Sequence, residues 1–345
     1  MNSFGRIFRI SIFGESHGES VGIVVDGCPA GIPLTVDDFL PDLERRKGGT
    51  QKGTTPRQEE DLPIFKSGLF NNKTTGAPIT ILFENKNIRS GDYEKQRDVP
   101  RPGHADFVAH KKFAGFEDYR GSGHFSGRLT VALVAAGVIA KKSLSQTLSE
   151  GGGFNSTPIQ ITSSILEIGG EKDLDKGLQK AIDAKDSIGG IIECRTAGLP
   201  VGLGEPFFDS AESLLSHIVF AIPAVRGIEF GTGFAAAKMF GSEHNDAILD
   251  VSGRTRTNHA GGIVGGLTNG NELVFRIAIK PTSSTPKEQN TLNWETGKVE
   301  TASVKGRHDL CIALRVPVIL EAVTAIVLAD LMMLEQRIQR VNKTG

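Results

Sequence analysis

Residues 9–29 read RISIFGESHGESVGIVVDGCP and hold two strand patterns on either side of a short polar loop. Alternating residues lead to Phe13, as in a half-buried strand, and a β-branched run over Val21–Val25 stops before Pro29. The loop between the strands places His17 on a tight turn with little side-chain bulk around it. A rigid imidazole of this kind suits general acid–base catalysis, and the alternative is a solvated turn histidine of a β-hairpin.

The composition of the whole chain is that of a globular protein with a sizeable core. The chain has 345 residues, of which 39% are hydrophobic and 23% are charged, and its mean hydropathy is −0.13. The net charge is −1 and the isoelectric point is about 6.7. No global field therefore attracts nucleic acid or a membrane surface, and we expect local clusters of cations to bind any anion.

The three cysteines and the apolar segments bear on the compartment. Cys28, Cys194 and Cys311 are far apart in apolar settings, which predicts buried free thiols in a reducing compartment. The N-terminus lacks the pattern of a secretion signal. The longest apolar stretch, Val316–Leu334, contains a proline and two acidic residues, so it predicts a core helix rather than a membrane span.

A basic cluster follows the first predicted helix. The pattern Thr35–Asp38 predicts a capped helix start, and the helix runs to about Lys47 before Gly48-Gly49. Cations at a helix C-terminus complement its dipole, but this run continues to Lys52 and Arg57 through a loop of glycine and threonine. Cations mixed with hydroxyls on such a loop favour an anionic ligand, such as a phosphate or a carboxylate.

Two later segments again place a histidine beside glycine. In Arg101–Asp106 (RPGHAD), Asp106 is placed either to orient His104 or to cap the next helix, and the alternative is an ordinary loop histidine. The segment Arg120–Arg128 (RGSGHFSGR) opens a predicted buried helix over 129–148. Free N–H groups at such a start suit a phosphate, whereas the alternative is a glycine-rich hinge, and the segment lacks the P-loop pattern.

The C-terminal third repeats this combination of residues. Thr257–Gly266 (TNHAGGIVGG) carries His259, and a predicted strand over 273–280 delivers Lys280–Ser284 (KPTSS). A lysine with three hydroxyls suits a phosphate, and the alternative is a turn whose hydroxyls bond their own backbone. Residues 284–303 predict a mobile loop or lid. Gly306–Asp309 (GRHD) precedes a predicted strand over 310–315 and a helix from Pro317.

Gly231–Ala236 imitates a dinucleotide fingerprint, because glycine, glycine and alanine fall at the required spacing after a strand-like run. The segment lies late in the chain, and no clear alternation of strand and helix surrounds it. We therefore reject it as a cofactor site. The remaining patterns predict strands over 77–83, 159–168 and 187–197 and helices over 173–185 and 210–221.

Taken together, these segments resemble the chorismate synthase family, in family order and over essentially the whole chain. No single motif is decisive, but seven in register are highly specific. The segments that carry the resemblance are 14–18 (GESHG) with the strand after it, 45–47 with Thr50, 101–106, 126–128, 258–262, 280–284 and 306–309.

The resemblance implies an α+β fold in which one domain, residues 1–345, forms a β-α-β sandwich with long central helices between antiparallel sheets. It implies a cytoplasmic homotetramer that binds a small-molecule substrate, with no nucleic-acid or membrane partner and no metal. The implied reaction is the 1,4-trans elimination of phosphate from 5-enolpyruvylshikimate 3-phosphate, which gives chorismate in the last common step of the shikimate pathway to aromatic amino acids. Reduced FMN is the implied cofactor, without net redox change, and some members reduce it with NADPH.

The resemblance also assigns roles to individual residues. His104 is implied to protonate the leaving phosphate, His17 to protonate the reduced flavin, and Asp309 to assist removal of the C6 proton. Arg46 matches a position associated with NADP in some members. Several buried anions require several cations, so the substrate is expected on Arg46, Lys47, Arg57 and Arg128. FMN contacts are implied for His124, Phe125, Ser126, Ala224, Gly265, Lys280, Pro281, Thr282, Ser283, Ser284 and Arg307.

Two positions depart from the family pattern. Leu310 replaces a usual proline, which changes turn stiffness but removes no functional group. Lys52 stands where an arginine is frequent, which keeps the charge but loses the bidentate fork of the guanidinium.

Two hypotheses from other classes remain. One is a nicotinamide-dependent oxidoreductase that uses Gly231–Ala236, and the other is a non-catalytic anion-binding module that uses the loop 45–57.

Overall fold

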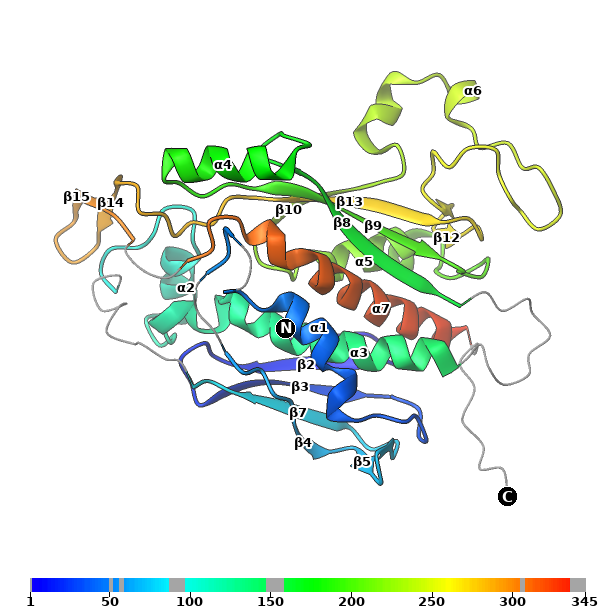
Figure 1. Ribbon diagram of the computed structural model, residues 1–345, viewed down its shortest axis with the longest axis horizontal. Coiled ribbons are helices and arrows are strands. Elements are labelled where there is room, and N and C mark those ends of the chain that lie inside the picture. Colours follow the sequence, from blue (N-terminus) through cyan, green and yellow to red (C-terminus); the bar gives the residue numbers. More distant parts are fainter. Residues whose placement is uncertain are drawn as a thin grey trace.

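Two apolar helices run side by side through the middle of the protein, and a sheet covers each side of the pair (Figure 1). The structure is a computed structural model that describes residues 2–49, 52–55, 59–86, 97–146, 158–304 and 308–335. Thr50, Arg57 and Arg307 of the predicted site segments lie outside these ranges. Both sheets are antiparallel, so the predicted sandwich with long helices between antiparallel sheets is confirmed.

The first sheet is built on the hairpin that the opening stretch predicts. β2 (Arg9–Gly14) pairs antiparallel with β3 (Ser20–Asp26), and Phe13 lies opposite Gly22. Alternate residues such as Ile23 are fully buried against the helices, as the two-residue period requires. The strand order is β1-β2-β3-β7-β4, with β1 at Ser3–Phe4, β7 at Ile79–Glu84 and β4 at Ile64–Ser67.

The antiparallel topology of the second sheet does not fit a dinucleotide-binding site at Gly231–Ala236. Its order is β10-β13-β9-β8, and every neighbouring pair is antiparallel. A dinucleotide site requires a strand in a parallel βαβ unit, whereas Gly231 here follows an antiparallel strand and leads into the 3-10 helix Gly233–Lys238. The strands are β10 at Val225–Phe230, β13 at Leu273–Ile279, β9 at Gly190–Ala197 and β8 at Gln160–Ile168.

The central helices are α3 (Thr130–Gln146) and α7 (Val316–Leu334). A Cβ added to Gly137 of α3 would lie 2.3 Å from the Cβ of Ala322 of α7, so the close approach of the two backbones requires glycine there. Taken with the 3-10 turns that lead into them, these helices form the segments Arg120–Ser145 and Ile312–Leu334, which are long and apolar enough to cross a membrane, but 78% of each apolar window is buried inside the protein. They are therefore placed as core helices, as predicted for Val316–Leu334.

The smaller elements surround this sandwich. The helix predicted from Thr35 to Lys47 forms in two pieces, a 3-10 helix (Val36–Asp38) and α1 (Leu40–Arg46), because Pro41 starts a new helical turn. The other helices are α2 at Asp106–Phe113, α4 at Leu174–Ala184, α5 at Ala211–Val219 and α6 at Gly241–His244. Two short hairpins are β5–β6, at Leu69–Phe70 and Lys73–Thr74, and β11–β12, at Ile263–Val264 and Leu267–Thr268.

Residues 284–303, which we expected to form a mobile loop or lid, contain a hairpin instead. β14 (Gln289–Asn293) pairs with β15 (Lys298–Ala302). At the tip of the hairpin, the Trp294 ring stacks on the ring of His110 in α2, with 4.6 Å between the ring centroids. The expectation of a loop was wrong, because the segment is held by Trp294 and by hydrogen bonds to the carbonyls of Asp98 and Pro100 rather than by an apolar pattern. Its mobility and its role as a lid stay predictions.

The strand predicted over 310–315 is also absent from the structure. Ile312–Arg315 forms a 3-10 helix that leads into α7. The backbone N–H groups of Leu310 and Cys311 both donate to the carbonyl of Gly53, so they do not form a ladder with a neighbouring strand.

Candidate active site

A cavity of about 670 Å³ lies at the N-terminal ends of α3 and α7. Its volume falls within the range of pockets that bind small molecules and cofactors. The wall combines apolar side chains with cations, histidines and hydroxyls, which suits a ligand with both ring and anionic parts. The apolar residues include Ile10, Leu133, Ile218, Ile222 and Ile319.

Most of the predicted site residues line this one cavity. His104 and Asp309 do so although they are far apart in the sequence. Gly265 does not line it, because this residue is exposed in the turn between β11 and β12. Arg57 and Arg307 lie outside the described residues. The predicted contacts that line the cavity are Arg46, Lys47, His124, Phe125, Ser126, Arg128, Ala224, Lys280, Pro281, Thr282, Ser283 and Ser284.

His17 lies directly behind the cavity wall and is only 5% exposed, so it is not a solvated turn histidine. A Cβ added to Gly121 would lie 2.3 Å from the Cδ2 of His17, which shows that the glycine backbone covers the ring. The side-chain amide of Asn85 donates to two carbonyls of the turn, at 3.0 and 2.9 Å, and fixes it. The neighbouring Ser16 lines the cavity, and its buried hydroxyl has no hydrogen-bond partner among the described residues.

His104 is held by a carboxylate and an arginine. Its Nδ1 lies 2.6 Å from an oxygen of Asp106, which accepts the proton and leaves Nε2 as the nitrogen for a ligand. Arg101 donates to Asp106 through Nε and Nη2, both at 2.7 Å, and also reaches the hydroxyls of Ser122 and Ser284. Burial alone would raise the pKa of the Asp106 carboxyl, but the hydrogen bonds from Arg101 and His104 hold this pKa well below its usual range.

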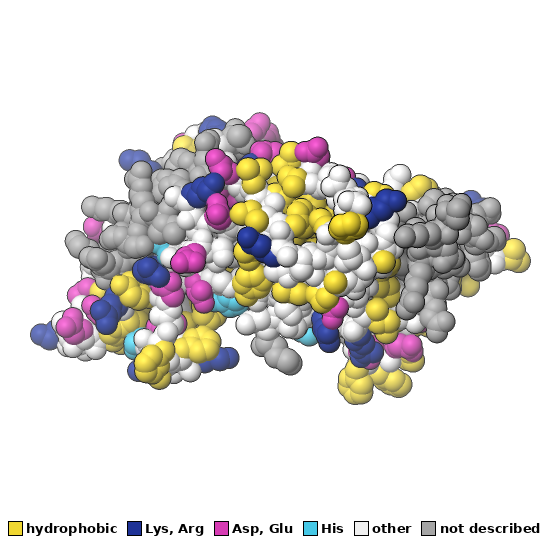
Figure 2. Space-filling view, turned by 90° about the horizontal axis from the view of Figure 1, so that it is seen from below, with side chains coloured by type: hydrophobic (Ala, Val, Ile, Leu, Met, Phe, Trp, Pro, Cys, Tyr) yellow, Lys and Arg dark blue, Asp and Glu magenta, His cyan; other side chains and the backbone are white. Residues whose placement is uncertain are grey.

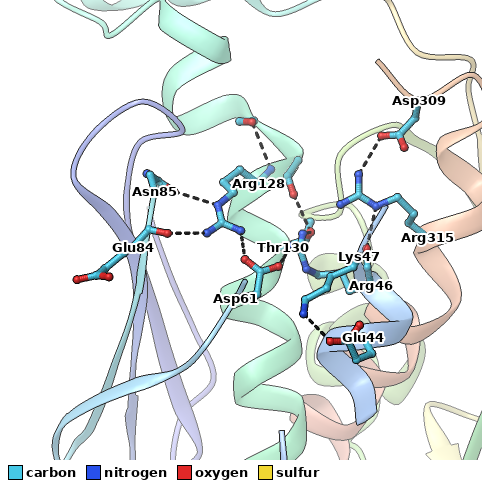
Figure 3. A network of polar contacts seen from close by, with 12 residues as sticks. Glu44, Arg46, Lys47, Asp61, Glu84, Asn85, Arg128, Thr130, Asp309 and Arg315 are labelled. Carbon is cyan, nitrogen blue, oxygen red and sulfur yellow. Dashed lines mark hydrogen bonds and ion pairs between the residues drawn. The ribbon is translucent and has the colours of Figure 1, made fainter. Parts of the chain in front are cut away.

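A buried ion cluster forms a second part of the wall (Figure 3). The Nη2 of Arg46 lies 2.5 Å from one oxygen of Asp61, and Arg128 pairs with the other oxygen. Burial lowers the pKa of both guanidiniums, although Asp61 opposes this effect. Burial would raise the pKa of Asp61, but the charges of Arg46 and Arg128 lower it to about 2. The sequence predicted both arginines but not the carboxylate between them.

Asp309 is oriented from two sides. One carboxylate oxygen accepts the backbone N–H of Thr55 at 2.9 Å, and the other lies 3.0 Å from the Nη1 of Arg315. The Nε of Arg315 also donates to the carbonyl of Arg46 at 2.8 Å (Figure 3). Arg315 therefore ties Asp309 to the end of α1, next to the buried ion cluster.

The turn 280–284 joins the His104 segment to the Asp309 segment. The Nζ of Lys280 donates to the carbonyl of Gly103 and to the hydroxyl of Ser283, both at 2.9 Å. The hydroxyl of Thr282 donates to the carbonyl of Asp309 at 3.1 Å. Burial and the nearby charge of Arg226 lower the pKa of Lys280. These bonds reach other segments, so the turn does more than bond its own backbone.

Three residues that organise the site were not predicted, namely Asp61, Asn85 and Arg315. Arg315 stands in an apolar run, and a charged residue in such a run predicts burial beside a partner, so this signal was present in the sequence. Asp61 and Asn85 follow no comparable pattern. Within the described residues, no group of three or more histidine, cysteine or acidic residues is placed to hold a metal ion.

Comparisons with known proteins agree on one family. The sequence model of a family described as chorismate synthase matches residues 8–333. A chorismate synthase from Chitinophaga pinensis is 69% identical over 343 residues, which cover 99% of this chain and all of the relative. A chorismate synthase from Methanocaldococcus jannaschii is 42% identical over 370 residues, which cover 96% of each chain. A solved structure described as a crystal structure of chorismate synthase has the same fold, with a TM-score of 0.70 at 24% identity, covering 96% of this chain and 93% of that chain.

Proposed function

The chain belongs to the chorismate synthase family, and from this premise we propose how its cavity carries out the family's reaction. The protein is a lyase that removes phosphate from 5-enolpyruvylshikimate 3-phosphate and forms chorismate. This identity decides against the two alternatives of an oxidoreductase and a non-catalytic binding module. The assignment of residues, cofactor and assembly that follows is our proposal.

One observation carries the assignment of the cavity: two of its cations, Arg46 and Arg128, are buried and keep donors that no described residue uses. Lys47 is partly buried and pairs with Glu44. The Nε of Arg46 is buried and has no hydrogen-bond partner among the described residues, although the side chain is only 3% exposed. An unsatisfied buried donor is costly unless a ligand accepts its hydrogen bond. The substrate brings a phosphate and two carboxylates, so we assign these anions to Arg46, Lys47 and Arg128. Arg57 remains a proposed contact that lies outside the described residues.

His104 is the proposed general acid. Departure of the phosphate requires a proton on the bridging oxygen or on the leaving group, and imidazole has a pKa suited to this transfer. Asp106 holds Nδ1 at 2.6 Å, which keeps the ring in one orientation. Nε2 then donates to the phosphate from the cavity wall.

Asp309 is the proposed partner in removal of the C6 proton, because its carboxylate is fixed by Thr55 and Arg315 and lines the same cavity as His104. His17 is proposed to supply a proton near the flavin. Its ring lies behind Gly121, so this transfer requires the Gly121 backbone to shift or a ligand to reach past it. We therefore expect a larger loss of turnover from His104→Ala than from His17→Ala, within roughly 10- to 1000-fold for each.

Reduced FMN is the proposed cofactor, and the residues present fit it. The apolar wall suits the flavin ring. The hydroxyl of Ser16, which no described residue bonds, and the turn 280–284 offer polar contacts. When bound, the reduced flavin would supply an electron-rich ring that stabilises the electron deficiency developing in the substrate, without net redox change. The other proposed FMN contacts are His124, Phe125, Ser126, Ala224, Gly265 and Arg307, of which Arg307 lies outside the described residues and Gly265 lies away from the cavity.

We propose NADPH as the reductant of the flavin, as in some members of the family. Arg46 is 2% exposed and bound to Asp61, which favours its role toward the substrate over a contact with a dinucleotide. Anaerobic oxidation of NADPH by the purified protein with FMN would support this proposal. Absence of oxidation, with full activity on photoreduced FMN, would remove it.

The activity is tested by anaerobic assay of phosphate release from the enolpyruvyl substrate with photoreduced FMN. We expect chorismate and phosphate in equal amounts, without stoichiometric consumption of reductant, and loss of turnover in His104→Ala. Phosphate release that consumes one equivalent of reductant would contradict the proposed elimination. Normal turnover in both His104→Ala and His17→Ala would remove the assignment of the acids.

We propose that the chain assembles as a homotetramer in the cytoplasm. Hydrophobic side chains gather across the middle of the face seen from below (Figure 2). The alternation of β2, β3 and β7 turns Phe13, Val24 and Leu82 to the outer face of the first sheet, where they are only partly buried. Such an apolar face favours a protein partner. Light scattering should give four times the chain mass of 36.9 kDa, and a monomer would contradict the proposal.

A further inference from the structure

Asp61 is a buried carboxylate placed between two arginines of the cavity wall (Figure 3). Its side chain is 0% exposed, and those of Arg46 and Arg128 are 3% and 5% exposed. The three residues come from separate parts of the chain, namely the last turn of α1, the segment before β4 and the 3-10 turn before α3. Their meeting is therefore a product of the tertiary fold, not of one local motif.

The backbone of Asp61 indicates that the position of this carboxylate is specified. Its φ is +53°, in the left-handed region that disfavours residues with a side chain and that aspartate and asparagine tolerate better than most. The conformation persists because the carboxylate accepts from a guanidinium on each oxygen.

The cluster leaves donors for a ligand. Each guanidinium has five N–H donors. Contacts within the described residues use two of the five on Arg46, to Thr130 and Asp61. They use three of the five on Arg128, to Asn85, Asp61 and the carbonyl of Glu84. Within the part of the chain that the structure describes, Arg46 thus keeps three donors and Arg128 keeps two, so an anion can bind while Asp61 remains in place.

Asp61 also sets the charge of the cluster. Two guanidiniums and one carboxylate leave a net charge of one, whereas the arginines alone would carry two. In a buried site with low effective dielectric, that difference acts strongly on a bound phosphate. An elimination that produces free phosphate needs a site that binds the anion and then releases it.

We propose that Asp61 is a positioning residue that aligns Arg46 and Arg128 and weakens their hold on phosphate, so that the product can leave. The proposal deepens, and rests on, the proposed function of the cavity. It predicts that removal of the negative charge strengthens phosphate binding. A residue with a purely structural role would give the opposite result, because its loss would disorder the arginines.

The test is Asp61→Asn in the full chain, which keeps the shape, one acceptor oxygen and tolerance of the left-handed region. Inorganic phosphate is titrated by calorimetry into the wild type and the variant. We expect phosphate to bind at least about tenfold more tightly to the variant. In steady-state assays, KM for the substrate and kcat should both fall, and product inhibition by phosphate should strengthen.

Two further variants keep the test decisive. Glu59 lines the cavity, and its charge acts on Arg128 from a less buried position, so Glu59→Gln should strengthen phosphate binding in the same direction but less. Glu60 is the matched control, because it pairs with Lys86 on the surface with its side chain 64% exposed. Glu60→Gln should leave phosphate affinity unchanged.

The outcomes separate this inference from the function on which it rests. If Asp61→Asn folds and binds phosphate as weakly as the wild type or more weakly, the inference is overturned. If this variant does not fold, Glu59→Gln decides in the same way. The phosphate titration does not depend on turnover, so a wild type that binds phosphate but releases none from the enolpyruvyl substrate would overturn the proposed function instead.

Discussion

Replacement of Asp106 by asparagine tests whether the orientation of His104 matters for proton transfer. The carboxylate lies 2.6 Å from the Nδ1 of His104 and receives two bonds at 2.7 Å from Arg101. An asparagine keeps the shape and one acceptor oxygen but loses the negative charge. The imidazole then lacks the charged partner that holds its ring in place.

The expected loss follows from these contacts. A hydrogen bond to a charged group contributes about 1.5–3 kcal/mol, and each 1.36 kcal/mol of barrier is a factor of about ten in rate, so kcat should fall roughly 10- to 150-fold. The side chain of Arg101 is 5% exposed and would face a neutral amide, so the free energy of unfolding should fall by about 3 kcal/mol.

The pH dependence of the free energy of unfolding gives an independent test of the contacts of Asp106. The pKa of Asp106 is lowered in the folded protein, so its contribution to stability is present above the unfolded pKa of about 3.9. That contribution is lost as the pH falls through the lower folded pKa. The difference in stability between the wild type and Asp106→Asn should therefore shrink in this acidic range.

Phosphate release and thermal unfolding are measured on the same preparations. The matched control is Glu117→Gln, which removes a carboxylate 3.1 Å from the Nδ1 of His110, a histidine whose side chain is 38% exposed and which does not line the cavity. The control should keep wild-type turnover. A folded Asp106→Asn protein with wild-type kcat would refute the orientation argument.

Two further predictions concern buried groups. Gly121→Ala should lower turnover at least about tenfold and the free energy of unfolding by about 2 kcal/mol. The reason is that the new Cβ would lie 2.3 Å from the ring of His17, at a backbone φ of +57°. A folded variant with unchanged melting temperature and turnover would contradict this packing. Burial raises the pKa of all three cysteine thiols to about 11, so a thiol reagent at pH 8 should modify none of them before the protein unfolds. Rapid labelling of the folded protein would contradict the burial of these thiols. The thiols are Cys28, Cys194 and Cys311.

The parts of the fold that follow from local patterns could be predicted from the sequence. The hairpin β2–β3 shows a two-residue period ended by glycine and proline, and Val316–Leu334 is a long apolar run that begins beside a proline. Each pattern depends on residues close in sequence. The hairpin β14–β15 and the 3-10 helix before α7 depend instead on long-range contacts, such as those of Trp294 with α2 and of Leu310 and Cys311 with the carbonyl of Gly53.

The candidate site shows the same division. Motifs rich in glycine, histidine and cations pointed to His104, Asp309 and most of the basic residues that line the cavity. Asp61 and Asn85 were missed because their partners are far away in the chain and their local sequence is ordinary. The burial of His17 could not be predicted either, since it depends on a glycine about a hundred residues later, Gly121.

A crystal structure of the protein with the enolpyruvyl substrate and FMN would test most directly whether one pocket holds these groups together. We expect substrate anions within hydrogen-bond distance of Arg46 and Arg128, the phosphate near Nε2 of His104, and the flavin against the apolar wall. A substrate bound on a different surface, or out of reach of both His104 and Asp309, would contradict the proposed mechanism.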